Sequence, residues 1–258
     1  MKKAIILLSF GTSVEEARQR DIAPVETALR SCTKLPCITA YTSPTIRKIL
    51  ARRGETVPGL EEAMAQLTTE GAECVEQILV QPTHLLYGYE YDNIRRTVGE
   101  QHLLGKPLLA GTEDIQYMAG VLDRISPKAL GTVHLYLGHG TEHFANAVYP
   151  ALQMALNLLG RGDILICTVE GWPGYLEVRQ ELAALSVKRV KLSPFMLVAG
   201  DHAVHDMAGE EPDSWKSRLE LEGYAVDCHM RGLGAVPQVR ALYQDHFRAL
   251  LAEAEYGL

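Results

Sequence analysis

The sequence holds three side chains that can bind a divalent metal, each shortly after a short apolar run typical of a buried strand: His139, Glu170 and His202. In open parallel sheets, ligands bind beyond the carboxyl ends of the strands, so residues distant in sequence can converge there. Two imidazoles and one carboxylate suit a first-row divalent metal that keeps open coordination positions. The sequence therefore predicts a metal site with room for a substrate.

Each of these residues also has a plainer interpretation. A histidine after a strand commonly makes only a loop hydrogen bond, and Glu170 could simply cap the Gly-Trp-Pro-Gly turn that follows it. Competing pairs of rings exist at His139-x3-His143 and at His202-x2-His205, although neither forms the His-Glu-x-x-His pattern of zinc proteases. The residues alone leave these alternatives open.

The predicted metal site belongs to the second copy of an internal repeat. Phe10-Gly11-Thr12 is repeated as His139-Gly140-Thr141, and Pro82-x5-Gly88-x-Glu90 is repeated as Pro194-x5-Gly200-x-His202. Histidine thus replaces Phe10 and Glu90 in the second copy. The repeat predicts two similar lobes with a cleft between them and a metal on one side. Glu90 is then the acid across the cleft, or else an acidic residue that favours the dipole of a helix N-terminus.

Apolar runs of four to eight residues alternate with stretches of helical periodicity, which is typical of parallel strands buried on both faces. The expected strands are Ala4–Leu8, Cys37–Thr42, Val75–Val80, Pro107–Leu109, Val133–Leu137, Ile164–Val169, Val187–Leu192 and Ala225–His229. The expected helices are Val14–Ser31, Ser43–Arg53, Leu60–Glu70, Asn93–Gln101, Asp114–Ile125, His143–Leu159, Tyr175–Leu185, Ser214–Glu222 and Pro237–Glu255. We therefore predict a duplicated α/β fold with lobes at residues 1–130 and 131–258, the second of which carries the metal ligands.

The composition excludes several classes of protein. The 258 residues are 47% hydrophobic, enough for a packed core, and the formal charge of −7 argues against nucleic acid or an anionic membrane surface as a partner. The five cysteines are scattered and include no Cys-x-x-Cys, which favours reduced thiols over a disulfide framework. The first apolar run is too short to span a membrane, and no small-residue cleavage site follows it. We expect a cytoplasmic protein.

A second group of residues could bind an anionic, aromatic ligand. The amides and hydroxyls of Ser9-Phe10-Gly11-Thr12-Ser13 precede an expected helix and could hold a carboxylate or phosphate. Neither the phosphate loop nor the Gly-x-Gly-x-x-Gly fingerprint is present, so nucleotide binding has little support. Tyr87 and Tyr89 alternate with acidic residues and offer flat faces suited to an aromatic macrocycle. Basic patches at Arg47, Lys48, Arg52 and Arg53 and at Arg95 and Arg96 could meet a polycarboxylate, although most such charges are solvated.

Four segments together resemble the anaerobic sirohydrochlorin cobaltochelatases of the CbiK type: Ser9–Ser13, Gly138-His139-Gly140, Val169-Glu170-Gly171, and Leu197–Ala208 followed by Asp213–Lys216. The resemblance extends from Lys2 to the final helix and is most specific from Ala199 to Trp215. It implies a class II chelatase related in fold to ferrochelatase. Such an enzyme has two similar Rossmann-like lobes with parallel sheets, one active-site cleft, no ATP and no second type of subunit.

The resemblance further implies that the chain inserts Co²⁺ into a tetrapyrrole polycarboxylate, sirohydrochlorin or precorrin-2, early in cobalamin biosynthesis. In that reading His139, Glu170 and His202 bind the metal, and His139 also serves as general base. Glu90 takes or relays a second proton. The substrate-binding residues are those of the first turn and the tyrosine-rich segment: Ser9, Phe10, Gly11, Thr12, Tyr87 and Tyr89.

One segment departs from the family pattern. The family often has Gly-Asp-Glu-Tyr-Glu where this chain has Gly88-Tyr89-Glu90-Tyr91-Asp92, so the glutamate is kept but its neighbours differ. The sequence also leaves other functions open: insertion of iron or nickel into the same substrate, a non-catalytic carrier of metal or tetrapyrrole, and a two-lobed small-molecule receptor. It leaves a homo-oligomer open as well.

Overall fold

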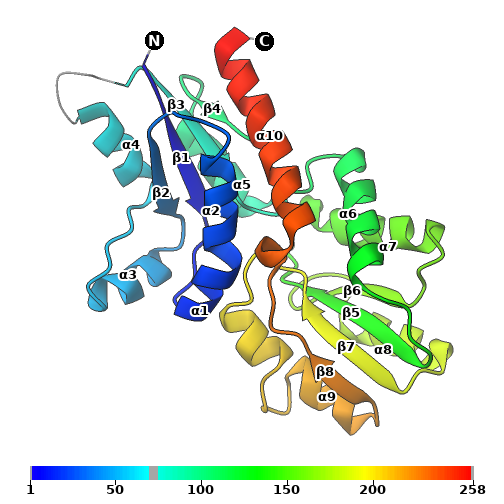
Figure 1. Ribbon diagram of the computed structural model, residues 1–258. Helices are drawn as coiled ribbons and strands as arrows, with labels where there is room; N and C mark the ends of the chain where they lie inside the picture. Colours follow the sequence, from blue (N-terminus) through cyan, green and yellow to red (C-terminus); the bar gives the residue numbers. More distant parts are fainter. Residues whose placement is uncertain (1, 70–74, 257–258) are drawn as a thin grey trace. The chain divides into compact units, whose positions relative to one another are not determined.

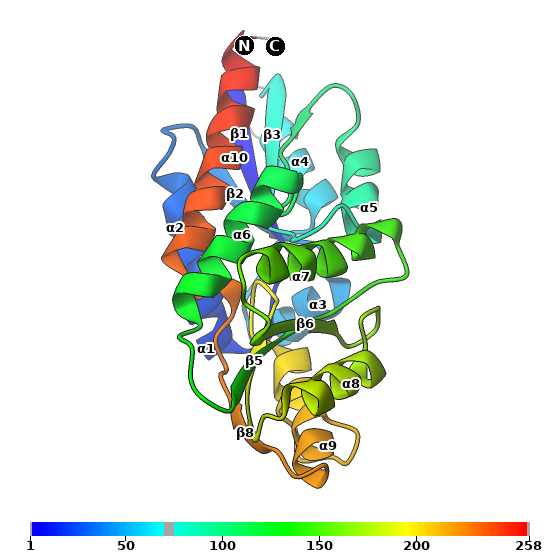
Figure 2. The same ribbon diagram turned by 90° about the vertical axis from the view of Figure 1, so that its right-hand side faces the viewer.

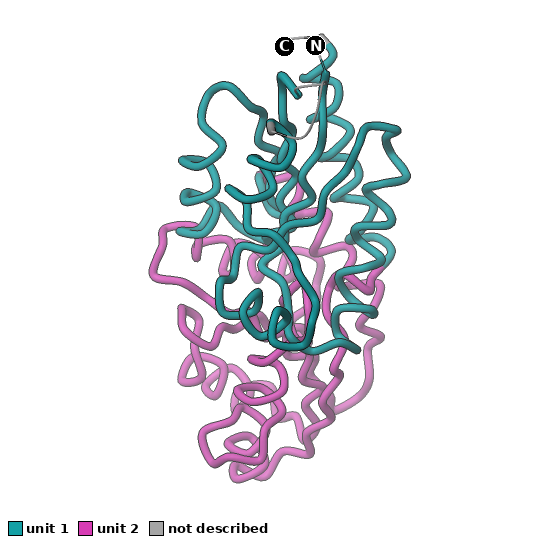
Figure 3. The backbone as a smooth tube through the Cα atoms, turned by 90° about the vertical axis from the view of Figure 1, so that its left-hand side faces the viewer, with its two compact units in different colours: residues 1–110, 237–258 teal, residues 111–236 magenta. Residues whose placement is uncertain are grey.

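The computed structural model describes residues 2–69 and 75–256 (Figure 1). The chain divides into two compact units, residues 1–110 with 237–258 and residues 111–236 (Figure 3). Each unit is built on a four-stranded parallel sheet covered by helices. The predicted α/β class with two parallel sheets is therefore confirmed.

The sheet of the first unit has the order β2-β1-β3-β4. Its strands are β1 (Lys3–Ser9), β2 (Cys37–Tyr41), β3 (Gln77–Pro82) and β4 (Leu103–Leu104). Its helices are α1 (Glu15–Ala17), η1 (Arg18–Ile22), α2 (Ala23–Arg30), α3 (Pro44–Arg52), α4 (Leu60–Thr69), α5 (Tyr89–Val98) and α10 (Pro237–Tyr256). Ile6 and Leu8 pack with α4 and α5 on one face. Successive side chains of a strand alternate in direction, so Ile5 and Leu7 face the other side, where α2 and α10 lie together (Figure 1).

The second unit repeats this order as β6-β5-β7-β8. Its strands are β5 (Thr132–Gly138), β6 (Ile164–Thr168), β7 (Arg189–Pro194) and β8 (Ala225–Cys228). Its helices are α6 (Thr112–Ile125), η2 (Phe144–Ala147), α7 (Val148–Leu158), α8 (Tyr175–Leu185), η3 (Ala203–Met207), α9 (Trp215–Leu221) and η4 (Leu233–Ala235). Helices α8 and α9 share one apolar core with the sheet. Helices α6 and α7 pack against each other (Figure 2).

The boundary between the units differs from the predicted division at residue 130. Helix α6 follows the strands of the first unit in sequence but packs against α7 of the second. Helix α10 follows the strands of the second unit but contacts α2, β3 and β4 of the first. Each unit therefore takes one helix from the other half of the chain. The prediction assumed that every helix packs on the strands just before it, and no residue pattern reveals such an exchange.

The internal repeat extends to individual hydrogen bonds at the carboxyl ends of the strands. In the first unit Thr83 N donates to Leu8 O over 2.8 Å, and in the second Phe195 N donates to Leu137 O over 2.7 Å. Ser43 N donates to Phe10 O over 3.3 Å, and the equivalent donor to His139 O is Glu170 N, at 2.8 Å. The three predicted metal ligands therefore have structural counterparts in the first unit: Phe10, Ser43 and Glu90.

Some predicted elements were wrong in position. Pro107–Leu109 is not a strand. The fourth strand is Leu103–Leu104, and Leu108 and Leu109 donate instead to carbonyls of the loop after β3. Pro107 has no N–H to offer a ladder, which disfavours a strand there. Helix α5 begins at Tyr89, before the predicted Asn93. Cys74 and the predicted end of the third helix at Glu70 lie outside the described residues.

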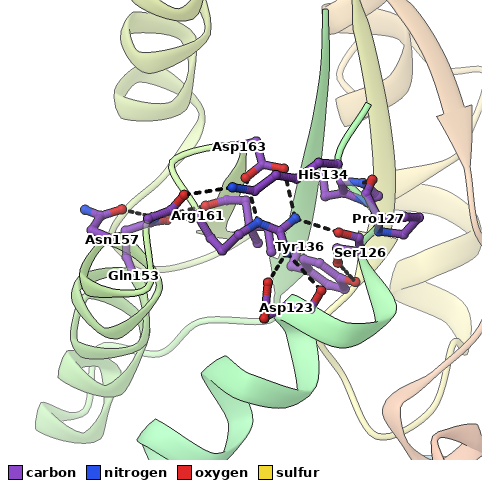
Figure 4. A network of polar contacts seen from close by, with 12 residues as sticks. Asp123, Ser126, Pro127, His134, Tyr136, Gln153, Asn157, Arg161 and Asp163 are labelled. Atoms are coloured by element: carbon purple, nitrogen blue, oxygen red, sulfur yellow. Dashed lines mark hydrogen bonds and ion pairs between the residues drawn. The ribbon is translucent and has the colours of Figure 1, made fainter. Parts of the chain in front are cut away.

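A buried arginine ties helix α6 to the sheet of the second unit (Figure 4). Arg161 is only 3% exposed, and its guanidinium donates to the carboxylates of Asp163 and Asp123 and, over 2.5 Å, to Ser126 O. Nearby, the hydroxyls of Ser126 and Tyr136 lie 2.8 Å apart. Hydrogen bonds from Arg161 hold the pKa of Asp163 below its usual value. This network restrains the turn at Ser126, between α6 and β5, and His139 directly follows β5.

Candidate metal-binding site

His139 follows β5 directly, and its ring is oriented by the backbone. Its Nδ1 lies 3.0 Å from the carbonyl oxygen of Gly140. A carbonyl can only accept a hydrogen bond, so Nδ1 carries the proton and Nε2 keeps a free lone pair. The side chain is 43% exposed, so Nε2 is accessible to a metal or a proton.

His202 is oriented by a side chain instead. Its Nδ1 lies 2.6 Å from Oδ2 of Asp206. An ionised carboxylate accepts, so Nδ1 again carries the proton and Nε2 keeps the lone pair. The residue was expected in a loop after β7, but it lies in a helical segment that continues as the π-helix η3. Helical geometry places residues four positions apart on one face, which brings Asp206 to the ring.

The rings of His139 and His202 lie against each other. Their centroids are 4.5 Å apart and their planes are perpendicular. His139 follows β5 and His202 lies in the helical segment after β7, and these two strands are neighbours in the sheet. Two imidazoles, each with Nδ1 protonated and Nε2 available, are the arrangement that a divalent first-row metal accepts from protein.

Glu170 lies beside this pair without joining it. Its Oε2 is 3.8 Å from Nδ1 of His139, beyond hydrogen-bond distance, and its side chain is 61% exposed. It therefore approaches the protonated edge of His139 rather than the Nε2 edge. Within residues 2–69 and 75–256, no three His, Cys, Asp or Glu side chains are already arranged to hold a metal ion. The three-ligand set of His139, Glu170 and His202 thus stays a prediction that requires Glu170 to change rotamer.

Asn146, on η2, joins the loops that carry His139 and Glu170. Its Oδ1 accepts from Thr141 N over 3.1 Å, and its Nδ2 donates to Trp172 O over 2.6 Å. The amide oxygen therefore binds one loop and the amide nitrogen binds the other. Asn146 could not be predicted as part of the site, because an asparagine in an expected helix looks like an ordinary polar surface position.

Glycines allow the two loops to approach closely. Gly140 has φ +83°, and a Cβ there would lie 2.5 Å from Gly171 N and 2.8 Å from Thr168 Cβ. A Cβ on Gly138 would lie 2.3 Å from the ring of Tyr149. Burial raises the pKa of Tyr149 to about 12, so its neutral hydroxyl can accept from Gly140 N. Only glycine fits at these positions.

The predicted substrate-binding turn of the first unit is partly turned inward. Ser9 is buried, with its hydroxyl 2.7 Å from that of Thr83, and buried Thr12 accepts from Val14 N. Gly11 has φ +93° and is packed against Tyr41. Phe10 is exposed. The hydroxyls of Ser9 and Thr12 are therefore used within the fold, and substrate binding by this turn stays a prediction.

Glu90 lies in the first turn of α5, as the helix N-terminus interpretation expected. Tyr87 stacks edge-on against Tyr91 with centroids 4.7 Å apart, while Tyr89 is exposed. Burial is the main cause that raises the pKa of Tyr91 to about 12, and its hydroxyl donates to Gly105 O. The catalytic role of Glu90 and the substrate contacts of Tyr87 and Tyr89 stay predictions.

Three other histidines, His84, His143 and His205, differ in their surroundings. His143 Nδ1 accepts from Ala145 N and so caps η2, and His205 faces Asp201 at 3.4 Å. Both ring nitrogens of His84 are buried, and neither has a hydrogen-bond partner among the described residues. Burial lowers the pKa of His84 to about 4, so this imidazole stays neutral.

Residues 3–252 match the family described as cobalt chelatase (CbiK). The chain belongs to this family. It is 32% identical to the sirohydrochlorin cobaltochelatase of Salmonella typhimurium over 260 residues, which covers 97% of each chain. It is 30% identical to the sirohydrochlorin cobaltochelatase CbiKC of Nitratidesulfovibrio vulgaris, covering 97% of this chain and 91% of that one. The recognised family and the enzyme class, a metal chelatase, are confirmed.

Solved structures agree on the fold. SirB from Bacillus subtilis with Fe³⁺ gives a TM-score of 0.64 at 17% identity, over 99% of this chain and 98% of that one. Sirohydrochlorin chelatase SirB from Bacillus subtilis subspecies spizizenii in complex with cobalt gives 0.60 at 16% identity, over 99% and 97%. At this identity the likeness supports the chelatase fold alone.

Among the described residues, no helix combines the length and the apolar character that crossing a membrane requires.

Proposed function

We propose that this chelatase inserts Co²⁺ into sirohydrochlorin, or its reduced form precorrin-2, without ATP, as a step of anaerobic cobalamin biosynthesis in the cytoplasm. The single observation that carries the proposal is the pair of perpendicular imidazoles, His139 and His202, within a chain of the cobalt chelatase family. The names of the two relatives at 32% and 30% identity support the substrate.

The proposed chemistry uses the same nitrogen of His139 twice. Nε2 of His139, Nε2 of His202 and a reoriented Glu170 carboxylate first hold Co²⁺ loosely. When the metal passes to the pyrrole nitrogens, the ring must lose two N–H protons. The lone pair of His139 Nε2, released by the metal, then accepts one proton, which suits a neutral imidazole near pH 7. Glu90 is proposed as the acceptor of the second.

The test is an anaerobic absorbance assay of purified protein with sirohydrochlorin, excess Co²⁺ and no ATP, repeated with Fe²⁺ and Ni²⁺. Multiple turnovers that outpace the protein-free reaction support a chelatase and rank the metals. A spectral change that stops at one equivalent would identify a carrier instead.

Two alanine variants test the role of His139. His139→Ala should lose turnover by at least about a hundredfold, the lower range for general acid–base catalysis. His229→Ala, an exposed histidine near the end of β8 that pairs with Asp227, is the matched control and should insert metal normally. Full turnover by His139→Ala would remove the general-base assignment.

A further inference from the structure

The carboxylate of Asp206 makes a short contact with a candidate metal ligand. Its Oδ2 lies 2.6 Å from Nδ1 of His202, at the short end of N–H···O hydrogen bonds to a carboxylate, which are typically about 2.7–2.9 Å long. Both side chains are more than 40% exposed, and an exposed ion pair contributes little to folding stability. The bond therefore has its main consequence for the imidazole itself.

We propose that Asp206 is a positioning residue that sets which nitrogen of His202 is offered to the metal. By accepting the proton of Nδ1 in a hydrogen bond, Asp206 leaves the lone pair on Nε2 and fixes the plane of the ring. Hydrogen bonds of this kind behind a ligating histidine also raise its basicity. The inference rests on the proposed cobalt insertion and names a further residue of that site.

The comparison of the two units supports this assignment. In the repeat, His202 corresponds to Glu90, and the position four residues later is Asp206 in the second unit and Ile94 in the first. Ile94 is buried in the apolar core of its unit. The carboxylate thus accompanies the histidine and is absent where a glutamate takes its place, as expected if its purpose is to orient an imidazole.

The other imidazole of the pair shows that the protein fixes the same tautomer twice. His139 Nδ1 is held by the carbonyl of Gly140, a backbone group that substitution cannot remove. For His202 the equivalent acceptor is a side chain, so its orientation depends on one replaceable residue. Loss of Asp206 should leave His139 unchanged and release only His202.

The chain supplies a matched control in the same segment. Asp201 and His205 have the same four-residue spacing, with 3.4 Å between Oδ1 and Nε2, and their side chains are 80% and 70% exposed. Asp201→Ala removes one negative charge next to His202 in sequence without touching the bond to Nδ1. Any effect of charge alone should therefore appear equally in Asp201→Ala and Asp206→Ala.

The first measurement is long-range ¹H–¹⁵N NMR of the metal-free protein at a pH of about 9, well above the free imidazole pKa of about 6.5. Wild type and Asp201→Ala should show His202 protonated on Nδ1. Asp206→Ala should move the proton of His202 towards Nε2, the tautomer that a free side chain prefers, while His139 keeps Nδ1–H. Asp206→Glu should restore part of the wild-type tautomer. An unchanged tautomer in Asp206→Ala would overturn the proposal.

The second measurement is anaerobic titration with CoCl₂ alone, followed through the visible absorption of bound Co²⁺. Asp206→Ala should bind Co²⁺ about 10- to 100-fold more weakly, as for other outer-shell partners of ligands. Asp201→Ala should stay within about twofold of wild type. His202→Ala combined with Asp206→Ala should bind no more weakly than His202→Ala, because Asp206 acts through that ring. Equal losses in the two aspartate variants would assign the effect to charge and refute the positioning role.

These readouts separate this inference from the proposed function. A wild-type protein that binds Co²⁺ and shows the expected tautomers, yet fails to turn over sirohydrochlorin, would refute the function and leave Asp206 as a positioning residue. Wild-type Co²⁺ affinity in His202→Ala would refute the inference, whether or not the protein turns over sirohydrochlorin.

Discussion

Replacement of Asn146 tests whether the metal site depends on the link between its two loops. Asn146→Ala removes the acceptor of Thr141 N–H and the donor to Trp172 O. A typical net hydrogen bond contributes about 0.5–1.5 kcal/mol, so two contribute about 1–3 kcal/mol. Because the side chain is partly exposed, water replaces some of this. We therefore expect Asn146→Ala to destabilise the joined arrangement of the two loops by about 1–2 kcal/mol.

The loss should appear mainly in metal binding, because His139 and Glu170 lie on the two loops that Asn146 joins. Each 1.4 kcal/mol is a factor of ten in affinity, so Co²⁺ should bind about 5- to 30-fold more weakly. Asn146→Asp keeps the acceptor for Thr141 N–H but sets an anion against the carbonyl of Trp172. It should bind Co²⁺ no better than Asn146→Ala. Titration with Co²⁺ and a thermal melt of each variant provide the measurements.

Asn157→Ala is the matched control. Asn157, at the end of α7, loses one exposed side-chain bond, from Gln153 Nε2 over 3.0 Å, and touches neither loop. Its Co²⁺ affinity should equal that of wild type. If Asn146→Ala bound Co²⁺ as tightly as Asn157→Ala, the glycine contacts alone would hold the loops together and the reasoning about Asn146 would fail.

Three further outcomes follow from the second unit. Gly140→Ala should abolish Co²⁺ binding, because the added Cβ would clash with Gly171. Gly160→Ala is the control, since Gly160 also has a positive φ but open space around it. It should lower the free energy of unfolding by only about 1–2 kcal/mol and keep the metal site. Arg161→Met should lower the free energy of unfolding by about 2–3 kcal/mol in urea titrations, below the range for fully buried pairs because both aspartates are partly exposed. Pairing with Arg161 lowers the pKa of Asp163 in the folded protein. The ion pair therefore contributes fully to the free energy of unfolding above the carboxyl pKa of the unfolded chain, about 4. This contribution is lost as the pH falls through the lower pKa that Asp163 has in the folded protein. Wild type should therefore lose stability more steeply than Arg161→Met over that acid range, and parallel pH profiles would contradict the assignment.

The sequence predicted the sheets well because their signals are local. The apolar runs of β1 and β5 are continuous because these strands are central and buried on both faces, and the predicted bounds agree within a residue or two. Pro107–Leu109 failed because a short apolar run with proline packs as a loop as readily as it forms a strand. The exchange of α6 and α10 escaped prediction because an amphipathic helix does not encode which of two similar sheets it covers.

The site was predictable in its residue types but not in its supports. His139 and His202 could be found because the repeat set them against Phe10 and Glu90. Asn146 and Asp206 could not be found in the same way, because their roles depend on bonds to a backbone carbonyl, a loop amide and a ring nitrogen. Only Asp206 had a weak signal, its four-residue spacing from His202, and that signal becomes meaningful once the segment is known to be helical.

The unequal restraint of the three predicted ligands suits a protein that must give its metal away. His139 and His202 each have Nδ1 held by a hydrogen bond and Nε2 available for metal. Glu170 is exposed, and its carboxylate lies 3.8 Å from Nδ1 of His139 rather than near Nε2. A fully preformed three-ligand site would bind Co²⁺ as tightly in the ground state as in the transition state of metal transfer. Such equal binding does not speed the reaction. Two fixed nitrogens and one adjustable carboxylate instead allow capture by three ligands and release by the rotation of one. Glu170 is therefore the ligand whose movement we expect to accompany transfer of the metal.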